Sequence, residues 1–167
     1  MPPGDPEDPP GDPESAARVI CLRLLDRRAY SRAELAGKLR ERGIPDDAAE
    51  RVLDRYVEVG LINDAALAAG LAGAQHRERG LARRAVAQKL RQRGLQDEID
   101  DALVGIDADS ERQRARELVA KRRRALSELP AEVQFRRLVG LLARKGYPSG
   151  VCYAVVREAL ALDEAPS

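Results

Sequence analysis

The residue types that could support catalysis are few in this chain of 167 residues. The sole histidine, His76, lies in the segment QHRERG near the end of an expected helix. No second imidazole is present to share a metal ion, and no serine or cysteine motif is recognisable that would pair a nucleophile with this base. We therefore expect His76 to be exposed, with a structural or incidental role.

Other catalytic patterns are missing as well. Gly37-Lys38 lacks the glycine-rich loop and the following hydroxyl that a phosphate-binding loop needs. The paired carboxylates Asp46-Asp47 and Asp100-Asp101 fall at helix starts or on outer helix faces, where acids usually cap helices or face water. We predict that the chain is not an enzyme and that it has no catalytic, cofactor-binding or metal-binding residues.

The cysteines and the apolar segments indicate the compartment. Cys21 and Cys152 are 131 positions apart, each inside an apolar stretch, so we expect reduced, buried thiols rather than a disulfide framework. No apolar run approaches the roughly 18 residues of a membrane span. The N-terminus is acidic and rich in proline, unlike a signal peptide. These features predict a cytoplasmic protein without a membrane association.

Basic side chains are the chemistry that the chain supplies in quantity. Spread along a row of helices, such side chains would form a stripe able to follow the phosphates of a nucleic acid. The alternative is that they are solvated helix ends, placed where cations favour the helix dipole. The candidate contact residues are Arg79, Arg83, Arg84, Lys89, Arg91, Arg93, Lys121, Arg122, Arg123, Arg124, Arg136, Arg137, Arg144 and Lys145.

The net charge of +1 conceals an asymmetry along the chain. Seven acids lie in residues 1–14 and 163–167, which hold no Lys or Arg. Between these ends, 21 acidic residues stand against 29 basic ones, so the body has a net charge of +8. That excess favours a polyanion or an acidic protein as partner.

One short motif occurs three times: LRERGI at 39–44, LRQRGL at 90–95 and LARKGY at 142–147. The glycines are 51 and 52 positions apart, which is typical of a tandem array rather than of one globular domain. A glycine at this place permits the left-handed turn with which a helix often ends. Each copy therefore predicts a tight corner between two helices.

The apolar periodicity predicts an all-α fold with about nine helices. We expect Ser15 to cap a first helix that carries Ala17 and Cys21 on its apolar face, and Ser31 with Glu34 to form a capping box before a helix that ends at Gly43. A third helix opens at 45–47, and its predicted apolar face is Ala49, Val52, Leu53, Tyr56 and Val57. Six more helices are expected near 64–78, 81–93, 96–105, 109–126, 130–145 and 148–161.

The copies stay in phase beyond the corner. Nine positions after the glycines are Val52, Leu103 and Val155, and ten positions after them are Leu53, Val104 and Val156. We therefore predict an elongated tandem array of three helix-turn-helix-like repeats of three helices, at 15–62, 63–107 and 108–162. Residues 1–14 repeat the element PPGDPE and are expected to be a disordered acidic tail, and residues 163–167 a short C-terminal tail.

Several of these motifs together resemble the RecX family, regulators of the bacterial recombinase RecA. They are YSRAEL at 30–35 with KL and RG at 38–43, then GLIND at 60–64, and RG at 79–80 with Leu90 and Gly94. The resemblance covers roughly residues 16–161 and is weaker in the third copy. The family usually has two aromatic residues and an arginine where this chain has Leu67, Leu71 and Gln75. Both leucines can still fill a core.

The resemblance implies a protein that lodges in the groove of the RecA-DNA filament and inhibits ATP hydrolysis, coprotease activity and strand exchange. Recombination, DNA repair and the SOS response would be modulated. Its partners would be the RecA filament, single-stranded DNA and also duplex DNA through phosphates, and it would act as a monomer without a cofactor. The alternatives are a helix-turn-helix DNA-binding protein or transcription factor acting without RecA, and a pure protein scaffold.

Overall fold

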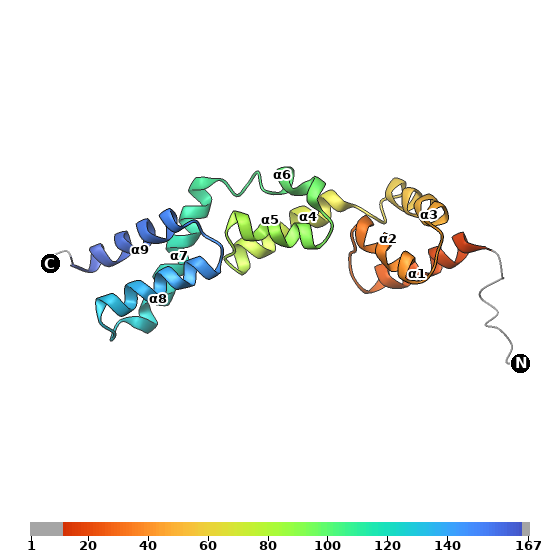
Figure 1. Ribbon diagram of the computed structural model, residues 1–167. Helices are drawn as coiled ribbons and strands as arrows, with labels where there is room; N and C mark the ends of the chain where they lie inside the picture. Colours follow the sequence, from red (N-terminus) through yellow and green to blue (C-terminus); the bar gives the residue numbers. More distant parts are fainter. Residues whose placement is uncertain (1–11, 165–167) are drawn as a thin grey trace, which may run out of the picture.

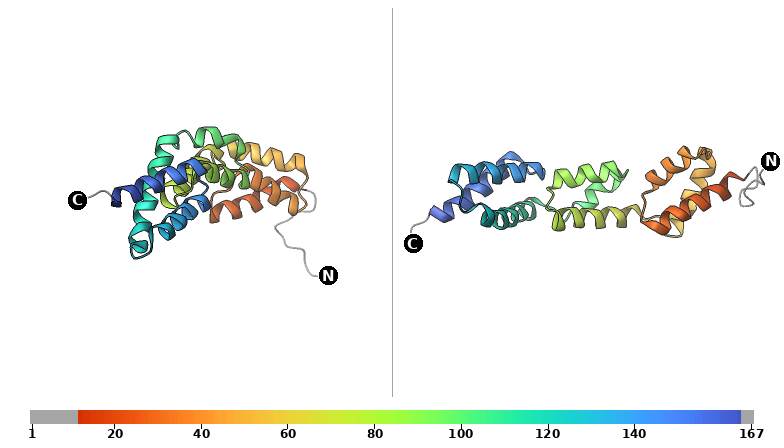
Figure 2. Two further views of the ribbon diagram at one scale, coloured as in Figure 1. Left: turned by 60° about the vertical axis from the view of Figure 1, so that its left-hand side comes forward. Right: turned by 90° about the horizontal axis from the view of Figure 1, so that it is seen from below.

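The computed structural model describes residues 12–164, with side chains to residue 161. Within that part of the chain, nine α-helices and two short helical turns are present and no strand is formed. The helices form three units that follow one another in a row (Figures 1 and 2). The all-α tandem array of three-helix repeats is thus confirmed, whereas the predicted disorder of the N-terminal tail falls mainly on residues outside the described part.

Repeat 1 consists of α1 (Pro13–Arg27), α2 (Arg32–Glu41) and α3 (Asp46–Glu58). The first helix begins three residues earlier than a Ser15 cap would place it, because Asp12 caps it and accepts a hydrogen bond from the Ser15 N–H. The capping box of Ser31 and Glu34 is present as predicted. Its core comprises Ala17, Cys21, Leu35, Leu39, Ala49, Val52, Leu53, Tyr56 and Ile62, whereas Val57, predicted for the apolar face, is 46% exposed.

Repeat 2 consists of α4 (Asp64–Gly73), a π-helical turn (Ala74–Glu78), α5 (Arg83–Gln92), a 3-10 turn (Gln96–Glu98) and α6 (Ile99–Ala102). The expected helix at 96–105 is therefore reduced to two short pieces. Asp97 lies three and four positions from Asp100 and Asp101, a like-charge spacing that destabilises a helix by about 0.2–0.5 kcal/mol per pair. Leu103 is buried as predicted, but Val104 is 73% exposed because the chain has already left the helix.

Leu67 and Leu71 occupy two positions at which the pattern described above usually has aromatic residues. Both are partly buried and pack against the core of repeat 2, which comprises Ala68, Ala72, Val86, Ala87, Leu90, Leu95, Leu103 and Ile106. The expectation that these leucines fill a core is confirmed.

Repeat 3 consists of α7 (Ala108–Leu126), α8 (Ala131–Arg144) and α9 (Ser149–Glu164), close to the predicted ranges. Its core includes Val119, Leu138, Leu142, Val155 and Val156. Ala82, from the start of α5 in repeat 2, also belongs to this core. Repeats 2 and 3 are therefore joined by apolar packing as well as by the chain.

The repeated motif forms the same corner in every repeat. In repeat 1 the Ile44 N–H donates to the Leu39 carbonyl and the Gly43 N–H to the Arg40 carbonyl, each at 3.0 Å. Both bonds recur at the corresponding positions after α5 and α8. This pair of bonds is a Schellman motif, in which glycine adopts a left-handed conformation and the residue after it contacts the last helical turn. The motif thus requires leucine, glycine and an apolar residue at fixed spacing.

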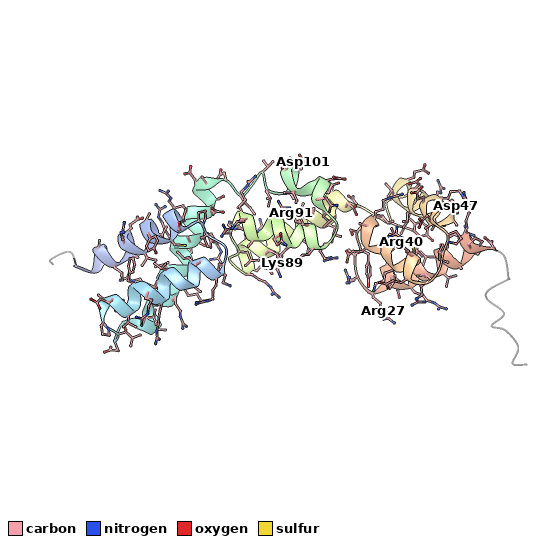
Figure 3. The ribbon with its side chains drawn as sticks, in the orientation of Figure 1. Arg27, Arg40, Asp47, Lys89, Arg91 and Asp101 are labelled. Atoms are coloured by element: carbon pink, nitrogen blue, oxygen red, sulfur yellow. The ribbon has the colours of Figure 1, made fainter. Side chains whose placement is uncertain are left out.

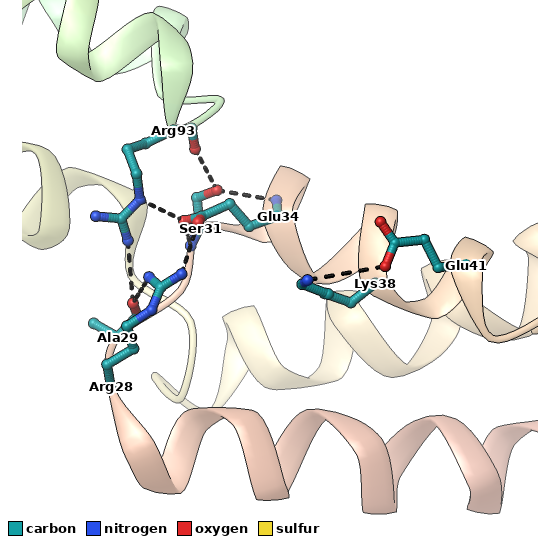
Figure 4. Close-up of polar contacts among 7 residues, drawn as sticks. All are labelled: Arg28, Ala29, Ser31, Glu34, Lys38, Glu41 and Arg93. Carbon is teal, nitrogen blue, oxygen red and sulfur yellow. Dashed lines mark hydrogen bonds and ion pairs between the residues drawn. The ribbon is translucent and has the colours of Figure 1, made fainter.

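The corner of repeat 2 joins repeats 1 and 2 by contacting the start of α2 (Figure 4). The Ser31 hydroxyl donates to the Arg93 carbonyl at 2.6 Å, and Arg93 Nε donates to Glu34 Oε1 at 2.9 Å. Gly94 lies so near Ala33 that a Cβ atom on the glycine would be 2.6 Å from the alanine Cβ. Only glycine permits this approach.

The corner of repeat 3 contacts the start of α5 in the same way. The Ala82 N–H donates to the Lys145 carbonyl at 2.9 Å, and a Cβ atom on Gly146 would be 2.8 Å from that of Ala85. The buried Tyr147 hydroxyl donates to the Gly80 carbonyl at 2.9 Å. Burial raises the pKa of Tyr147 to about 12, so this donor keeps its proton at neutral pH.

Replacing Tyr147 by phenylalanine should weaken the joint between repeats 2 and 3. The Gly80 carbonyl would lose its buried partner, which costs about 1–3 kcal/mol of unfolding free energy. Tyr153→Phe is the matched control, because Tyr153 is 43% exposed and should change stability by less than about 0.5 kcal/mol. Urea unfolding measures both, and equal effects of the two substitutions would contradict a structural role for the Tyr147 hydroxyl.

The joint between repeats 1 and 2 should depend on the charge of Glu34. Burial raises the pKa of Glu34, but hydrogen bonds from the Ser31 N–H, Arg93 and Arg28 outweigh it and hold the pKa below its ordinary value of 4.5. A lowered folded-state pKa contributes stability above the unfolded pKa, and this contribution is lost as pH falls through the folded value. Glu34→Gln should therefore destabilise at pH 7, and the difference from wild type should shrink below about pH 4.5.

Urea unfolding across a pH series measures this difference. Glu41→Gln is the control on the same helix, since the Glu41 side chain is 71% exposed and its Oε2 atom lies 3.8 Å from Lys38 Nζ. It should change the unfolding free energy by less than about 0.5 kcal/mol at every pH. A destabilisation by Glu34→Gln that is as large at pH 3 as at pH 7 would disprove the charge dependence.

Candidate binding surface

Most of the predicted contact residues lie on the surface of repeats 2 and 3. Eleven of the fourteen are exposed, and ten of these have side chains that make no hydrogen bond or ion pair within residues 12–161. The ten are Arg79, Arg84, Lys89, Arg91, Lys121, Arg122, Arg124, Arg136, Arg137 and Arg144. Such side chains keep their full charge toward solvent and are available to a partner.

The other four predicted residues are engaged within the protein or partly covered. Arg83 Nη1 donates to the carbonyls of Leu103 and Ile106 at 2.7 Å each, which holds the segment that enters α7. Arg93 bridges repeats 1 and 2, and Lys145 Nζ donates to the Arg79 carbonyl at 2.8 Å. Arg123 is half-buried. Position in a basic cluster therefore does not by itself indicate a free cation.

The surface cations of repeat 1 are mostly paired with acids, unlike those of repeats 2 and 3. Its ion pairs include Arg32 with Asp54 at 2.8 Å, Arg55 with Glu58 at 3.2 Å and Arg40 with Asp46 at 3.6 Å. Exposed pairs of this kind stabilise little, but they neutralise the local field. Residues 108–162 of repeat 3 hold twelve basic and six acidic residues, so positive charge accumulates at the C-terminal unit.

Within repeat 2, Lys89 and Asp101 lie on opposite edges. Figure 3 shows Lys89 of α5 at the lower edge of the repeat and Asp101 of α6 at its upper edge. Asp97, Asp100 and Asp101 are all exposed. A polyanion would consequently approach the edge formed by α5 and be repelled by the edge formed by α6.

His76 is buried, so the expectation of an exposed histidine is wrong. Only 7% of the residue is accessible, and Nδ1 lies 2.8 Å from the Leu81 carbonyl. The His76 carbonyl accepts a hydrogen bond from Arg114 Nε of repeat 3 at 3.1 Å. The residue lies in the π-helical turn after α4, and this departure from α-helical spacing left no signal in the periodicity. Its surroundings indicate a structural role at the joint of repeats 2 and 3.

An apolar groove at the junction of repeats 1 and 2 was not predicted from the sequence. It has a volume of about 440 Å³, and its walls include Tyr30, Leu61, Leu67, Gly70 and Leu71. The Arg28 guanidinium lies 3.7 Å from the centroid of the Tyr30 ring. The run of small apolar residues at 65–73 is the signal that could have indicated it, because alanine and glycine leave little side chain to fill the space beside a helix.

The described residues supply no recognisable reactive centre. No group of three His, Cys, Asp or Glu side chains among them is arranged to hold a metal ion. Both cysteines are buried, and burial raises the pKa of Cys21 to about 11 and raises that of Cys152. These thiols therefore remain protonated and poorly nucleophilic near neutral pH. None of the helices between residues 12 and 164 is both long and apolar enough to span a membrane.

The three repeats match three family models in order. Models of the first, second and third three-helix domains of RecX match residues 17–55, 63–103 and 109–156. The fold is also that of the crystal structure of RecX from Lactobacillus salivarius, with a TM-score of 0.76 and 20% identity over 88% of this chain and 96% of that one.

Curated relatives agree over nearly the whole chain. The regulatory protein RecX of Thermobifida fusca is 48% identical over 95% of this chain and 86% of that protein. The regulatory proteins RecX of Streptomyces lividans and Mycobacterium ulcerans are 49% and 46% identical, over 95% and 98% of this chain and 81% and 94% of those proteins. With three domain models matched in order and relatives this similar, the chain belongs to the RecX family of regulatory proteins.

Proposed function

We propose that this protein binds the RecA filament on DNA and inhibits its ATPase, coprotease and strand-exchange activities. The observation that carries the proposal is the set of ten exposed, unpaired cations along repeats 2 and 3 of an elongated molecule. Contacts with phosphates release counterions from DNA, so many weak ion pairs add up to strong binding. The protein acts in the cytoplasm, as a monomer, on recombination, repair and the SOS response.

The shape of the molecule supports a filament as the partner. Each repeat has its own apolar core, and the three cores follow one another along the row. A ligand of this shape can contact several successive subunits, and the linked contacts then raise the affinity beyond that of any one contact. Bridging neighbouring subunits would hinder the changes between them that ATP hydrolysis requires.

The alternative, sequence-specific DNA binding by helix-turn-helix units, fits the charges less well. In such units the helix after the corner enters the major groove with its N-terminal residues toward the bases. Here α3 starts with Asp46-Asp47, and α6 is only four residues long and carries Asp100-Asp101. Acids at these positions would repel the DNA backbone. We therefore expect weak DNA binding without preference for a defined operator.

Inhibition of RecA ATP hydrolysis is the direct test of this function. The purified protein, added below the RecA concentration, should lower the rate of hydrolysis on single-stranded DNA, because one elongated ligand contacts several subunits. The measurement is phosphate release across a titration, with bovine serum albumin as the protein control. An unchanged rate up to equimolar protein would refute the proposal, and selective operator binding without RecA would favour the alternative.

Charge reversal at the end of α7 should weaken filament binding. Arg122→Glu with Arg124→Glu removes two unpaired cations, so affinity should fall and the slope of log K against log salt should decrease by up to about 2. Arg40→Glu with Arg55→Glu is the matched control, because it makes the same change in net charge at paired cations of repeat 1. Fluorescence anisotropy of labelled filaments measures affinity, and circular dichroism verifies the fold. Equal losses from both double variants would assign the effect to overall charge.

A further inference from the structure

The two joints of the array use one recognition geometry. At each joint a corner glycine lies over an alanine in the first turn of the preceding repeat's second helix. The carbonyl before the glycine accepts a hydrogen bond from the N-cap residue of that helix, from the Ser31 hydroxyl at 2.6 Å or the Ala82 N–H at 2.9 Å. The corners of repeats 2 and 3 therefore each contact the N-terminus of a helix.

The cation before the glycine completes this geometry. Arg93 Nη2 donates to the Ala29 carbonyl at 3.2 Å, and Lys145 Nζ donates to the Arg79 carbonyl at 2.8 Å. Both carbonyls lie in the loop that precedes the contacted helix. Arg93 also reaches Glu34, the third residue of α2. At both joints the basic residue thus contacts the start of a helix through its backbone carbonyl and its charged side chain. The glycine after it has no side chain and allows the two backbones to approach closely.

Repeat 1 has the same corner, and no described residue is docked on it. A Cβ atom on Gly43 would meet no atom within 4 Å, although its φ of 76° matches the 70° of Gly94. The exposed Arg42 side chain makes no ion pair within the described residues. Ile44 is only half-buried, whereas Leu95 and Tyr147 at the docked corners are 1% and 2% exposed. The first corner therefore has the shape of a contact that residues 12–164 do not supply.

We infer that the corner Arg42-Gly43-Ile44 binds the N-terminus of a helix in the partner protein. Resting on the proposed function, the helix belongs to a RecA subunit of the filament. Both joints have a small residue in the first turn and an N-cap hydroxyl or N–H that donates to the corner carbonyl, so we expect the same toward the Arg42 carbonyl. The joint between repeats 1 and 2 adds an acid at the third helical position, which would pair with the Arg42 guanidinium. This contact adds a specific protein site to the less specific cations of repeats 2 and 3.

A second copy of the chain is a poorer occupant. Among the helices of residues 12–164, α8 is the only second helix of a repeat whose start is not covered by a following repeat, and its N-cap residue is Pro130. Proline has no N–H and no hydroxyl, so it offers no donor to the Arg42 carbonyl. Head-to-tail association through this corner would therefore lack the hydrogen bond present at both joints.

Gly43→Asn tests the inference, with Gly60→Asn as the matched control. Asparagine tolerates a left-handed backbone better than other side chains, and both glycines have open space around a Cβ atom, with φ of 76° and 80°. Gly60 follows α3, a full helix length from the corner. Gly43→Asn should weaken binding to RecA filaments about tenfold or more, because the new side chain collides with a docked helix. Gly60→Asn should change affinity less than about twofold, at equal thermal stability.

Arg42→Glu provides a second variant that leaves the backbone unstrained. Its control is Arg40→Glu, which makes the same charge change on the same helix at a cation paired with Asp46. Filament affinity should fall for Arg42→Glu and change less for Arg40→Glu. Sedimentation velocity of the free proteins accompanies both pairs, so that self-association is detected.

The outcomes separate this inference from the proposed function. The wild-type protein could bind filaments while the Gly43 and Gly60 variants have equal affinities and the Arg42 and Arg40 variants do as well. That result would overturn the corner as a docking site and leave RecA binding intact. A wild-type protein that does not bind filaments would overturn both. Self-association of the free protein that Gly43→Asn abolishes would assign the corner to a second copy instead. Selective losses at Gly43 and Arg42 support the inference.

Discussion

The contact of a corner glycine with the first turn of the preceding repeat is the constraint that gives the molecule its length. At 2.6 and 2.8 Å from the opposing alanine, a Cβ atom on Gly94 or Gly146 has no room, so any other residue would push the repeats apart. Each repeat has a small core of its own, and stability of the row then depends on contacts between neighbours. A rod results because each joint repeats the same geometry.

The parts of the fold that depend on residues close together in the sequence could be predicted. The Ser31 and Glu34 capping box and the three glycine corners are local, and each leaves a fixed spacing. The burial of His76 could not be predicted, because the residue lies in a π-helical turn and its carbonyl accepts a hydrogen bond from Arg114, 38 positions away in the next repeat. The short α6 was also missed, since Ile99, Leu103 and Ile106 keep helical spacing although the α-helix ends at Ala102.

The basic clusters contain two kinds of residue that composition does not distinguish. Arg93 and Lys145 bind carbonyls and a carboxylate 59 to 66 positions away, so their role exists only in the folded array. Arg91 and Arg144, close to them in the same motif, remain exposed. The difference is one of helical phase: the last basic residue before the glycine faces the joint, and those before it face solvent. The periodicity of the motif could have separated them.

The two ends of the row are unequal, and this inequality determines where the array stops. Contacts that run head to tail do not close on themselves, so identical repeats could add further units indefinitely. At the C-terminal end Pro130 replaces the donor that Ser31 and Ala82 supply, which removes one hydrogen bond from any added joint. At the N-terminal end the corner of repeat 1 keeps every element of the joint. The joint geometry therefore disfavours extension at α8 and leaves the corner at Gly43 uncovered by residues 12–164, which is where a helix of a partner protein would complete the contact.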